Sequence, residues 1–119
     1  MKHLAFLLFV IIIIVSGCKK EPDPLPPAKK LPYASFSGHQ EGIKGKATVT
    51  FTNKSKDATQ FIYYFGDGYE YSTYSKDPIY HVYYNNTFND TTYYATLKAI
   101  NDSHDTATSL PWPVMLMGY

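Results

Sequence analysis

The spacing of apolar residues from Leu31 onward is the feature that most constrains this chain. Apolar and polar side chains alternate there with the two-residue period of a β-strand, and the helical period is absent. Glycine, asparagine, aspartate and serine interrupt the alternation about every 8 to 12 residues. The pattern predicts strands near residues 33–37, 47–53, 59–65, 69–74, 80–84, 92–100 and 106–116. We therefore expect an all-β domain, an antiparallel sandwich of about seven strands in two sheets.

Alternation within three of these strands identifies the side that faces the core. The residues expected to face inward are Ala47, Val49 and Phe51; Phe61, Tyr63 and Phe65; and Tyr93, Ala95, Leu97 and Ala99. The chain has one cysteine, so no disulfide within it can hold the domain together. The stability must come from this aromatic-rich core, and the loss of one core ring should be costly.

Residues 1–17 have the features of a lipoprotein signal peptide. Lys2 supplies the positive charge, and an unbroken apolar run of twelve residues extends from Leu4 to Val15. The run is too short for a transmembrane helix, which needs about 20 residues. The next residues, Ser16-Gly17-Cys18, resemble the bacterial lipobox, in which the leader is cut before the cysteine and the cysteine is acylated. The alternative is a free thiol beside an ordinary cleavage site.

Residues 18–32 are expected to link the lipid to a domain at 33–119. Five of the fourteen residues after Cys18 are proline, which favours an extended polyproline geometry. Acyl chains on Cys18 would anchor the protein in the cell envelope, and we expect the outer membrane of a Gram-negative bacterium. The charged start of the linker, Lys19 to Asp23, loosely resembles export signals of surface lipoproteins, which would place the domain outside the cell. Alternatively, its lysines only contact anionic headgroups.

The most specific local motif is Phe65-Gly66-Asp67-Gly68. Asp67-Gly68 stands between two aromatic strand segments and predicts a two-residue hairpin turn with positive φ at both positions. Gly66 allows a tight strand end, and the Asp67 carboxylate can accept hydrogen bonds from nearby backbone amides. A catalytic role for Asp67 is disfavoured, because no second acid or histidine lies at a suggestive spacing.

Three blocks of the sequence together resemble the polycystic kidney disease (PKD) domain. They are Phe61-x-Tyr63-Tyr64-Phe65-Gly66-Asp67-Gly68; then Ser75, Pro78 and His81-x-Tyr83; and then Tyr93-x-Ala95-x-Leu97-x-Ala99-x-Asn101. The chain departs from the family pattern at Tyr63-Tyr64, where the family has Trp-Asp, and before Tyr93, where the usual glycine is missing. The resemblance implies an immunoglobulin-like sandwich in an extracellular protein that serves adhesion, spacing, or protein or polysaccharide binding without catalysis. It also implies structural roles for His81 and Tyr83 beside the Phe65 to Gly68 motif.

No cofactor, metal or nucleic acid is expected as a partner. The histidines at 39, 81 and 104 lack the spacing of a zinc site. The loop Asn101 to Asp105 hints at calcium, but Thr106 and Trp112 stand where an EF-hand-type loop needs glycine and glutamate, so an ordinary polar loop is favoured. The net charge is +1 and every basic residue is lysine, which disfavours nucleic acid.

The chain carries more aromatic residues than alternation can bury. If Phe61, Tyr63 and Phe65 point inward, Tyr64 points outward on the same strand. Tyrosine rings suit stacking on sugars or gripping extended polypeptide. The candidate ligand-binding surface consists of Tyr64, Tyr69, Tyr71, Tyr94 and Trp112. The alternative is that these rings only cover the sheet and form cross-strand pairs.

The preferred function is therefore a membrane-anchored extracellular module for binding or adhesion, with a protein or polysaccharide ligand. The alternative is a structural accessory subunit that docks to a larger envelope or secretion complex. An enzyme is not expected, because the sequence offers no acid pair, no metal cluster and no pocket-forming insertion.

Overall fold

The computed structural model describes residues 28–119. The predicted signal peptide, the predicted acylation site at Cys18 and most of the proline-rich linker lie outside the described residues. Among the residues described, no helix is long and apolar enough to cross a membrane.

The described residues form an all-β fold, as the sequence predicts. The strands are β1 (Phe36–Glu41), β2 (Lys46–Asn53), β3 (Gln60–Tyr64), β4 (Glu70–Thr73), β5 (Ile79–Tyr84), β6 (Thr91–Ile100), β7 (Thr106–Thr108) and β8 (Trp112–Leu116). Every pair of neighbouring strands is antiparallel. Eight strands therefore replace the seven that were predicted, and the two-sheet sandwich is confirmed.

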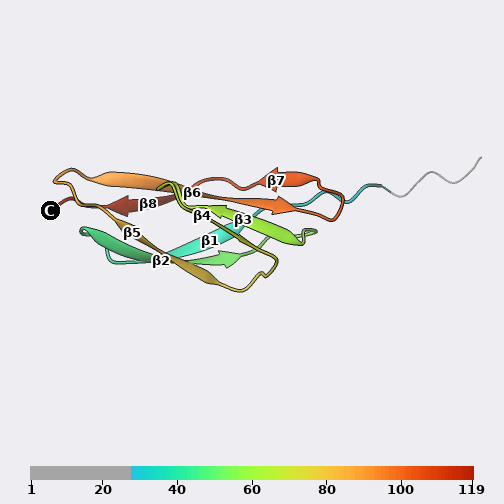
Figure 1. The fold of residues 1–119 in the computed structure, drawn as a ribbon, viewed down its shortest axis with the longest axis horizontal. Coiled ribbons are helices and arrows are strands. Elements are labelled where there is room, and N and C mark those ends of the chain that lie inside the picture. The colour runs from blue at the N-terminus through green and yellow to red at the C-terminus, as the bar shows by residue number, and fades with distance from the viewer. Residues whose placement is uncertain (1–27) are drawn as a thin grey trace, which may run out of the picture.

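The strands form two layers, which lie one above the other in Figure 1. The small sheet has the order β1-β2-β5. The large sheet has the order β4-β3-β6, and β7 and β8 both pair with the far edge of β6. Strand β1 therefore shares one side of the sandwich with β8, and β5 shares the opposite side with β4.

One predicted strand, 106–116, is wrong in that the structure divides it in two. β7 pairs with Lys98 to Ile100, and β8 pairs with Thr91 to Ala95 of the same strand. The three residues between them face only two residues of β6, so one extra residue forms a bulge. Pro111 lies in this bulge and has no backbone N–H to give to a ladder. The Ser109 hydroxyl compensates by accepting a hydrogen bond from the Leu97 backbone N–H at 2.9 Å.

The first predicted strand, 33–37, is shifted in the structure to Phe36–Glu41. Its predicted start survives as a single backbone bridge between Tyr33 and Lys56. Pairing with six residues of β2, from Asn53 back to Thr48, carries β1 beyond the predicted end. The partner strand, and not the local alternation, thus determines where β1 ends.

The core confirms the three predicted inward faces. Its buried members are Ala34, Ala47, Val49, Phe51, Phe61, Tyr63, Phe65, Tyr83, Ala95, Leu97, Ala99, Val114 and Leu116, with Tyr93 and Trp112 packed partly buried against them. Phe51 lies at the centre, with its ring 5.8 Å from that of Phe65 and 6.1 Å from that of Trp112. These rings join the small sheet to both β3 and β8 of the large sheet, and such aromatic pairs add to the free energy gained from burial alone.

Candidate functional site

One long side of the sandwich, which we call the closed side, is held together by β1 and β8. The side-chain amide of Gln40 on β1 donates a hydrogen bond to the backbone oxygen of Met115 on β8, at 2.8 Å. The Trp112 ring lies so close to Gly38 on β1 that a methyl group there would come within 2.8 Å of the indole. Glycine at 38 thus allows the tryptophan to cover the gap between the two sheets.

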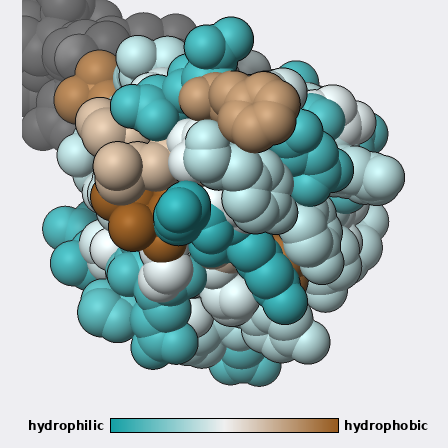
Figure 2. Space-filling view, turned by 90° about the vertical axis from the view of Figure 1, so that its left-hand side faces the viewer, coloured by the Kyte–Doolittle hydropathy of each residue, from teal (hydrophilic) through white to brown (hydrophobic). Residues whose placement is uncertain are grey.

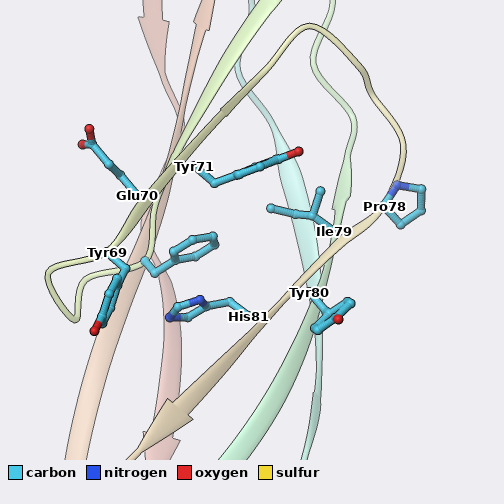
Figure 3. Close-up of a pocket in the computed structure, with 8 residues that line it drawn as sticks. Tyr69, Glu70, Tyr71, Pro78, Ile79, Tyr80 and His81 are labelled. Atoms are coloured by element: carbon cyan, nitrogen blue, oxygen red, sulfur yellow. The ribbon is translucent and has the colours of Figure 1, made fainter.

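The opposite side, which we call the open side, lies between β4 and β5. These strands are the outermost members of their sheets and do not pair with each other. A groove of about 450 Å³ separates them (Figure 3). Its walls are formed by Tyr69 and Tyr71 from the β4 segment and by Ile79, Tyr80 and His81 from β5, and Phe65 and Pro78 complete the lining together with Glu70.

The open side exposes side chains that face the inside of the sandwich. Tyr71 is paired with Tyr63 across β3 and β4, so both rings lie on the inner face of the large sheet. Tyr63 is only 1% exposed, whereas Tyr71 is 47% exposed and Tyr69 is 70% exposed. Figure 3 shows Tyr71 reaching across the groove toward Ile79, while Glu70 points away from it. Within the described residues, no strand of the small sheet covers β4, and two inner-face tyrosines remain accessible for this reason.

The loop between β3 and β4 differs from the predicted two-residue turn. The Phe65 backbone N–H donates to the Tyr69 oxygen at 3.1 Å, which leaves a loop of three residues, Gly66-Asp67-Gly68. Positive φ occurs at Gly66 (83°) and Gly68 (94°), and not at Asp67. The Asp67 carboxylate accepts from the Tyr69 N–H at 3.1 Å and so closes the loop through its side chain. The prediction of positive φ at Asp67 is therefore wrong, because the two glycines take both of these conformations.

Asp67 has a partner that the sequence spacing did not reveal. The His81 ring donates through Nε2 to the Asp67 carboxylate, at 2.6 Å. The same imidazole lies parallel to the Phe65 ring, with 3.9 Å between centroids. The sequence does indicate that His81 points inward, because strand alternation places residues 79, 81 and 83 on the inner face of β5. The pairing itself depends on how the two sheets pack.

A second groove of about 390 Å³ continues the open side beyond this pair. It is lined by Asp67, Tyr69, His81, Val82, Tyr84 and Tyr93. Tyr69 and His81 line both grooves, so the aspartate–histidine pair separates two parts of one aromatic surface. No serine, threonine or cysteine lines either groove, and the hydroxyl groups in their lining are those of tyrosines.

Two buried tyrosines support the open side from below. The Tyr83 hydroxyl donates to the Phe65 backbone oxygen at 2.9 Å and thereby fixes the strand end before the Gly66 loop. Burial raises the pKa of Tyr83 strongly, and the negative charge of Asp67 raises it further. Burial also raises the pKa of Tyr63. Both groups are thus held as neutral phenols. The Tyr83 hydroxyl is hydrogen-bonded, whereas the buried Tyr63 hydroxyl has no hydrogen-bond partner among the described residues.

The five residues predicted to form one ligand-binding surface lie in three places. Tyr69 and Tyr71 line the groove of the open side. Tyr64 and Tyr94 are exposed on the outer face of the large sheet, on the neighbouring strands β3 and β6. Trp112 faces inward and packs against the core, so its assignment to an exposed surface is wrong. Trp112 was included because the chain has more aromatic residues than alternation can bury, and the bulge before β8 turns this residue inward.

The candidate ligand-binding surface did not include the tyrosines of β5, although the sequence shows them among the surplus aromatic residues. Tyr80 is 73% exposed and Tyr84 is 56% exposed, and each lines one of the two grooves. Both residues precede or follow an inward-facing residue by one position, so alternation was sufficient to place them outside. What it could not show is that β5 is an edge strand beside β4.

The loop from Asn101 to Asp105 satisfies its own polar groups. The Asn101 side-chain oxygen accepts from the backbone N–H groups of Ser103 and Asp105, and its amide donates to the Asp105 carboxylate. The pKa of Asp105 is lowered, chiefly by its hydrogen bond with Lys29. Among the described residues, no group of three histidine, cysteine, aspartate or glutamate side chains is placed to hold a metal ion.

The fold is similar to that of two solved PKD domains. The PKD1 domain of the Vibrio cholerae metalloprotease PrtV superposes with a TM-score of 0.55 at 18% identity, covering 74% of this chain and 99% of that one. The PKD1 domain of Vibrio anguillarum Epp gives a TM-score of 0.55 at 18% identity, covering 77% and 100% of the two chains. No protein-family model and no curated protein matches the sequence. At this identity the likeness shows the fold, which is the PKD-like sandwich that the sequence motifs predict.

Proposed function

From this PKD-like fold with one open side, we propose that the protein is an extracellular binding module whose ligand occupies the groove between β4 and β5. The observation that carries the proposal is the exposure of Tyr69 and Tyr71 on an inner sheet face. In a two-layer sandwich such residues are normally covered, and a large aromatic surface left open is typical of an interaction site. Binding, and not catalysis, is the role that the lining of the groove supports.

The proposed ligand classes are a protein and a polysaccharide. Tyrosine offers a flat apolar face with a polar tip and loses little side-chain entropy when it is fixed. The rings of Tyr69, Tyr71 and Tyr80 stand along a groove of a size that takes several sugar rings or a short stretch of chain. The lining contains no lysine, so recognition would rest on aromatic contact and hydrogen bonds.

The test is a matched pair of double variants of the full chain, purified in detergent micelles. Glycan arrays and arrays of extracellular matrix proteins are the probes. We expect Tyr69→Ala with Tyr71→Ala to abolish specific binding, and Tyr64→Ala with Tyr94→Ala to retain it. The second pair removes two exposed tyrosines from the outer face of the same sheet and controls for loss of aromatic surface. Equal binding by both variants, or an array without specific binding, would refute the proposal.

We also propose that acylation of Cys18 anchors the module in the outer membrane. The support is the lipobox-like Ser16-Gly17-Cys18 and the absence of any other cysteine in the chain. Cells producing the protein should incorporate labelled palmitate into it, and Cys18→Ser should lose the label and release the protein from the membrane fraction. Retention of label in that variant would contradict acylation at this residue.

One observation favours the alternative of an accessory subunit that docks to a larger complex. Hydrophobic side chains gather on part of the end of the molecule shown in Figure 2. Ile43 and Met117 are joined by a backbone hydrogen bond, and Tyr119 is bonded to Thr87 beside Phe88, which is 87% exposed. A stable complex recovered in mild detergent from the native envelope, and lost with Phe88→Ser but kept with Tyr69→Ala, would support docking through this end.

A further inference from the structure

We infer that the ligand of the open side is an extended polypeptide segment that adds to the free edge of β5 as a fourth strand of the small sheet. This inference rests on the proposed function, because it identifies the occupant of the same groove. The added strand would lie beside β5 and above β4, where its inward side chains would cover the exposed tyrosines.

The two sheets differ in width, and the difference leaves space for one strand. The small sheet has three strands, whereas the large sheet places β8, β6, β3 and β4 side by side. At the closed side β1 reaches β8, so the missing width falls entirely at the open side. Tyr71 and Tyr69 are the inner-face residues that remain uncovered there. A fourth strand beside β5 would cover them as the core covers Tyr63.

The hydrogen-bonding phase of β5 identifies which backbone groups are free. Asn85 N–H donates to the Gly45 oxygen, and these two residues continue the β2–β5 register by one step. Hydrogen-bonded and non-hydrogen-bonded pairs alternate in an antiparallel ladder. The backbone groups of Tyr80, Val82 and Tyr84 must therefore point away from β2, toward the open side. The Tyr84 oxygen confirms this direction, because it accepts from the Tyr93 hydroxyl at 3.0 Å. That oxygen is therefore occupied, and the free part of the edge is formed by Tyr80 and Val82.

The β5 edge lacks the features by which proteins usually prevent strand addition. Protected edges carry lysine, an internal proline or a bulge, or are very short. β5 has six residues, none of them lysine or proline, and it pairs with β2 without a break in register. Pro78 stands just before the strand and ends the free edge on that side. Unpaired N–H and C=O groups at strand spacing are complementary to another extended backbone and not to a sugar chain.

The charges around the groove do not favour an acidic polysaccharide. Glu70 belongs to the lining but points away from the groove, and Asp67 in the continuation is paired with His81. No lysine lines either part, so an anionic glycan would find no lysine there to compensate its charge. A segment with alternating apolar residues fits both the backbone edge and the tyrosine-lined wall.

The test uses the full chain in detergent micelles and a phage-displayed library of random linear peptides. We expect enriched peptides with alternating apolar residues, bound by the wild type and by the Tyr64→Ala, Tyr94→Ala control. A backbone N-methyl scan of one enriched peptide should weaken binding on the order of tenfold at every second residue, since each such methyl removes one hydrogen bond to β5. This readout leaves the protein unchanged and does not depend on how a variant folds.

The protein-side variant is Val82→Pro, with Val82→Ala as its control. Proline removes a backbone donor that faces the free edge and leaves the bonds to β2 in place, so folding should be retained and peptide affinity lost. Alanine keeps the donor and should keep the affinity within about threefold. The comparison requires that Val82→Pro and Val82→Ala unfold at the same temperature. If they do not, the N-methyl scan of the peptide decides whether a strand is added.

The outcomes separate this inference from the proposed function. Peptide binding without the two-residue periodicity would overturn strand addition and leave the groove as a binding site. Binding of a glycan alone, lost with Tyr69→Ala and Tyr71→Ala, would do the same. Self-association of the chain that Val82→Pro abolishes, with no peptide enriched, would place a second copy on the edge and overturn the inference. If neither a peptide nor a glycan binds the wild type or the two double variants, both strand addition and the proposed binding function are overturned.

Discussion

The two long sides of the sandwich differ in whether the gap between the two sheets is covered. On the closed side, β1 and β8 are bridged by a side-chain hydrogen bond, and Trp112 fills the gap above Gly38. On the open side, the inner-face residues Tyr69 and Tyr71 are left without a covering strand. The comparison teaches that residues of the same chemical kind contribute to stability on one side and are available to a ligand on the other. Substitutions on the two sides should therefore affect different measurements.

The largest effect on stability is expected from Trp112→Ala on the closed side. The indole is packed against the core and lies edge-on to the Phe51 ring. Its removal opens a cavity between the sheets and should lower the free energy of unfolding by about 3 kcal/mol. Urea denaturation of the full chain measures this directly. A loss below about 1 kcal/mol would show that closure of this side is not a main source of stability.

The next largest effect is expected from Gly66→Ala, at the loop that begins the open side. A methyl group at Gly66 would come within 2.4 Å of the Tyr94 backbone oxygen, in a residue that already has positive φ. The clash and the strain together should cost about 2–3 kcal/mol. Gly68→Ala is the matched control, because Gly68 also has positive φ but faces open space. It should cost only about 1 kcal/mol, and equal losses would contradict the close approach at Gly66.

Alkaline pH should destabilise the protein through the buried tyrosines. The folded chain holds the pKa of Tyr83 well above the ordinary value near 10. The unfolded chain therefore releases this proton first, and the free energy of unfolding should be constant below about pH 9 and fall above about pH 10. Tyr83→Phe should reduce this slope without abolishing it, since Tyr63 titrates in the same direction.

The same variant has a separate effect at neutral pH. Loss of the Tyr83 hydroxyl leaves the buried Phe65 oxygen without its donor, which should cost about 1–2 kcal/mol. Chemical denaturation at several pH values measures both effects on the same samples. Identical alkaline slopes for wild type and variant would show that Tyr83 is not the group responsible.

Tyr71→Ala on the open side should have a small effect on stability and a large one on binding. The ring is 47% exposed and no strand lies over it, so we expect a loss of about 0.5–1 kcal/mol from its contacts with the groove walls. Trp112→Ala should therefore change the free energy of unfolding more than ligand binding, and Tyr71→Ala should change ligand binding more than the free energy of unfolding. A loss equal to that of Trp112→Ala would mean that the open side is as much a part of the core as the closed side.

Much of this fold was predictable because alternation and turn residues report local geometry. The inner faces of β2, β3 and β6 follow from the two-residue period, and the Phe65 to Gly68 motif marks a hairpin between β3 and β4. The bulge before β8 was not predictable, because it depends on the Ser109 hydroxyl replacing a backbone acceptor for Leu97. The inward position of Trp112 follows from that bulge, and a surplus of aromatic residues in the sequence does not show which of them is buried.

The candidate site was predictable only in part, for a related reason. Tyr69 and Tyr71 were identified as surplus aromatic residues, but their exposure comes from strand order, which a single strand does not encode. The Asp67–His81 contact joins two sheets across fourteen positions of sequence. Local patterns specify which way a side chain points. They do not specify whether another strand will cover it.

The smallest effect is expected at neither side, but at the base of the linker. Lys29 contacts the Asp105 carboxylate at 3.0 Å, and this hydrogen bond is the main cause of the lowered pKa of Asp105. Lys29→Ala should raise that pKa toward the ordinary range near 4, as followed by NMR titration of the carboxyl carbon. The lowered pKa favours the folded state above this range and ceases to do so as the pH falls below it, so any difference between wild type and variant should disappear in acid. Because Lys29 is exposed, both sides should keep their stability and binding. A change in either would show that the linker is coupled to the sandwich, and the comparison of its two sides would then have to include the linker.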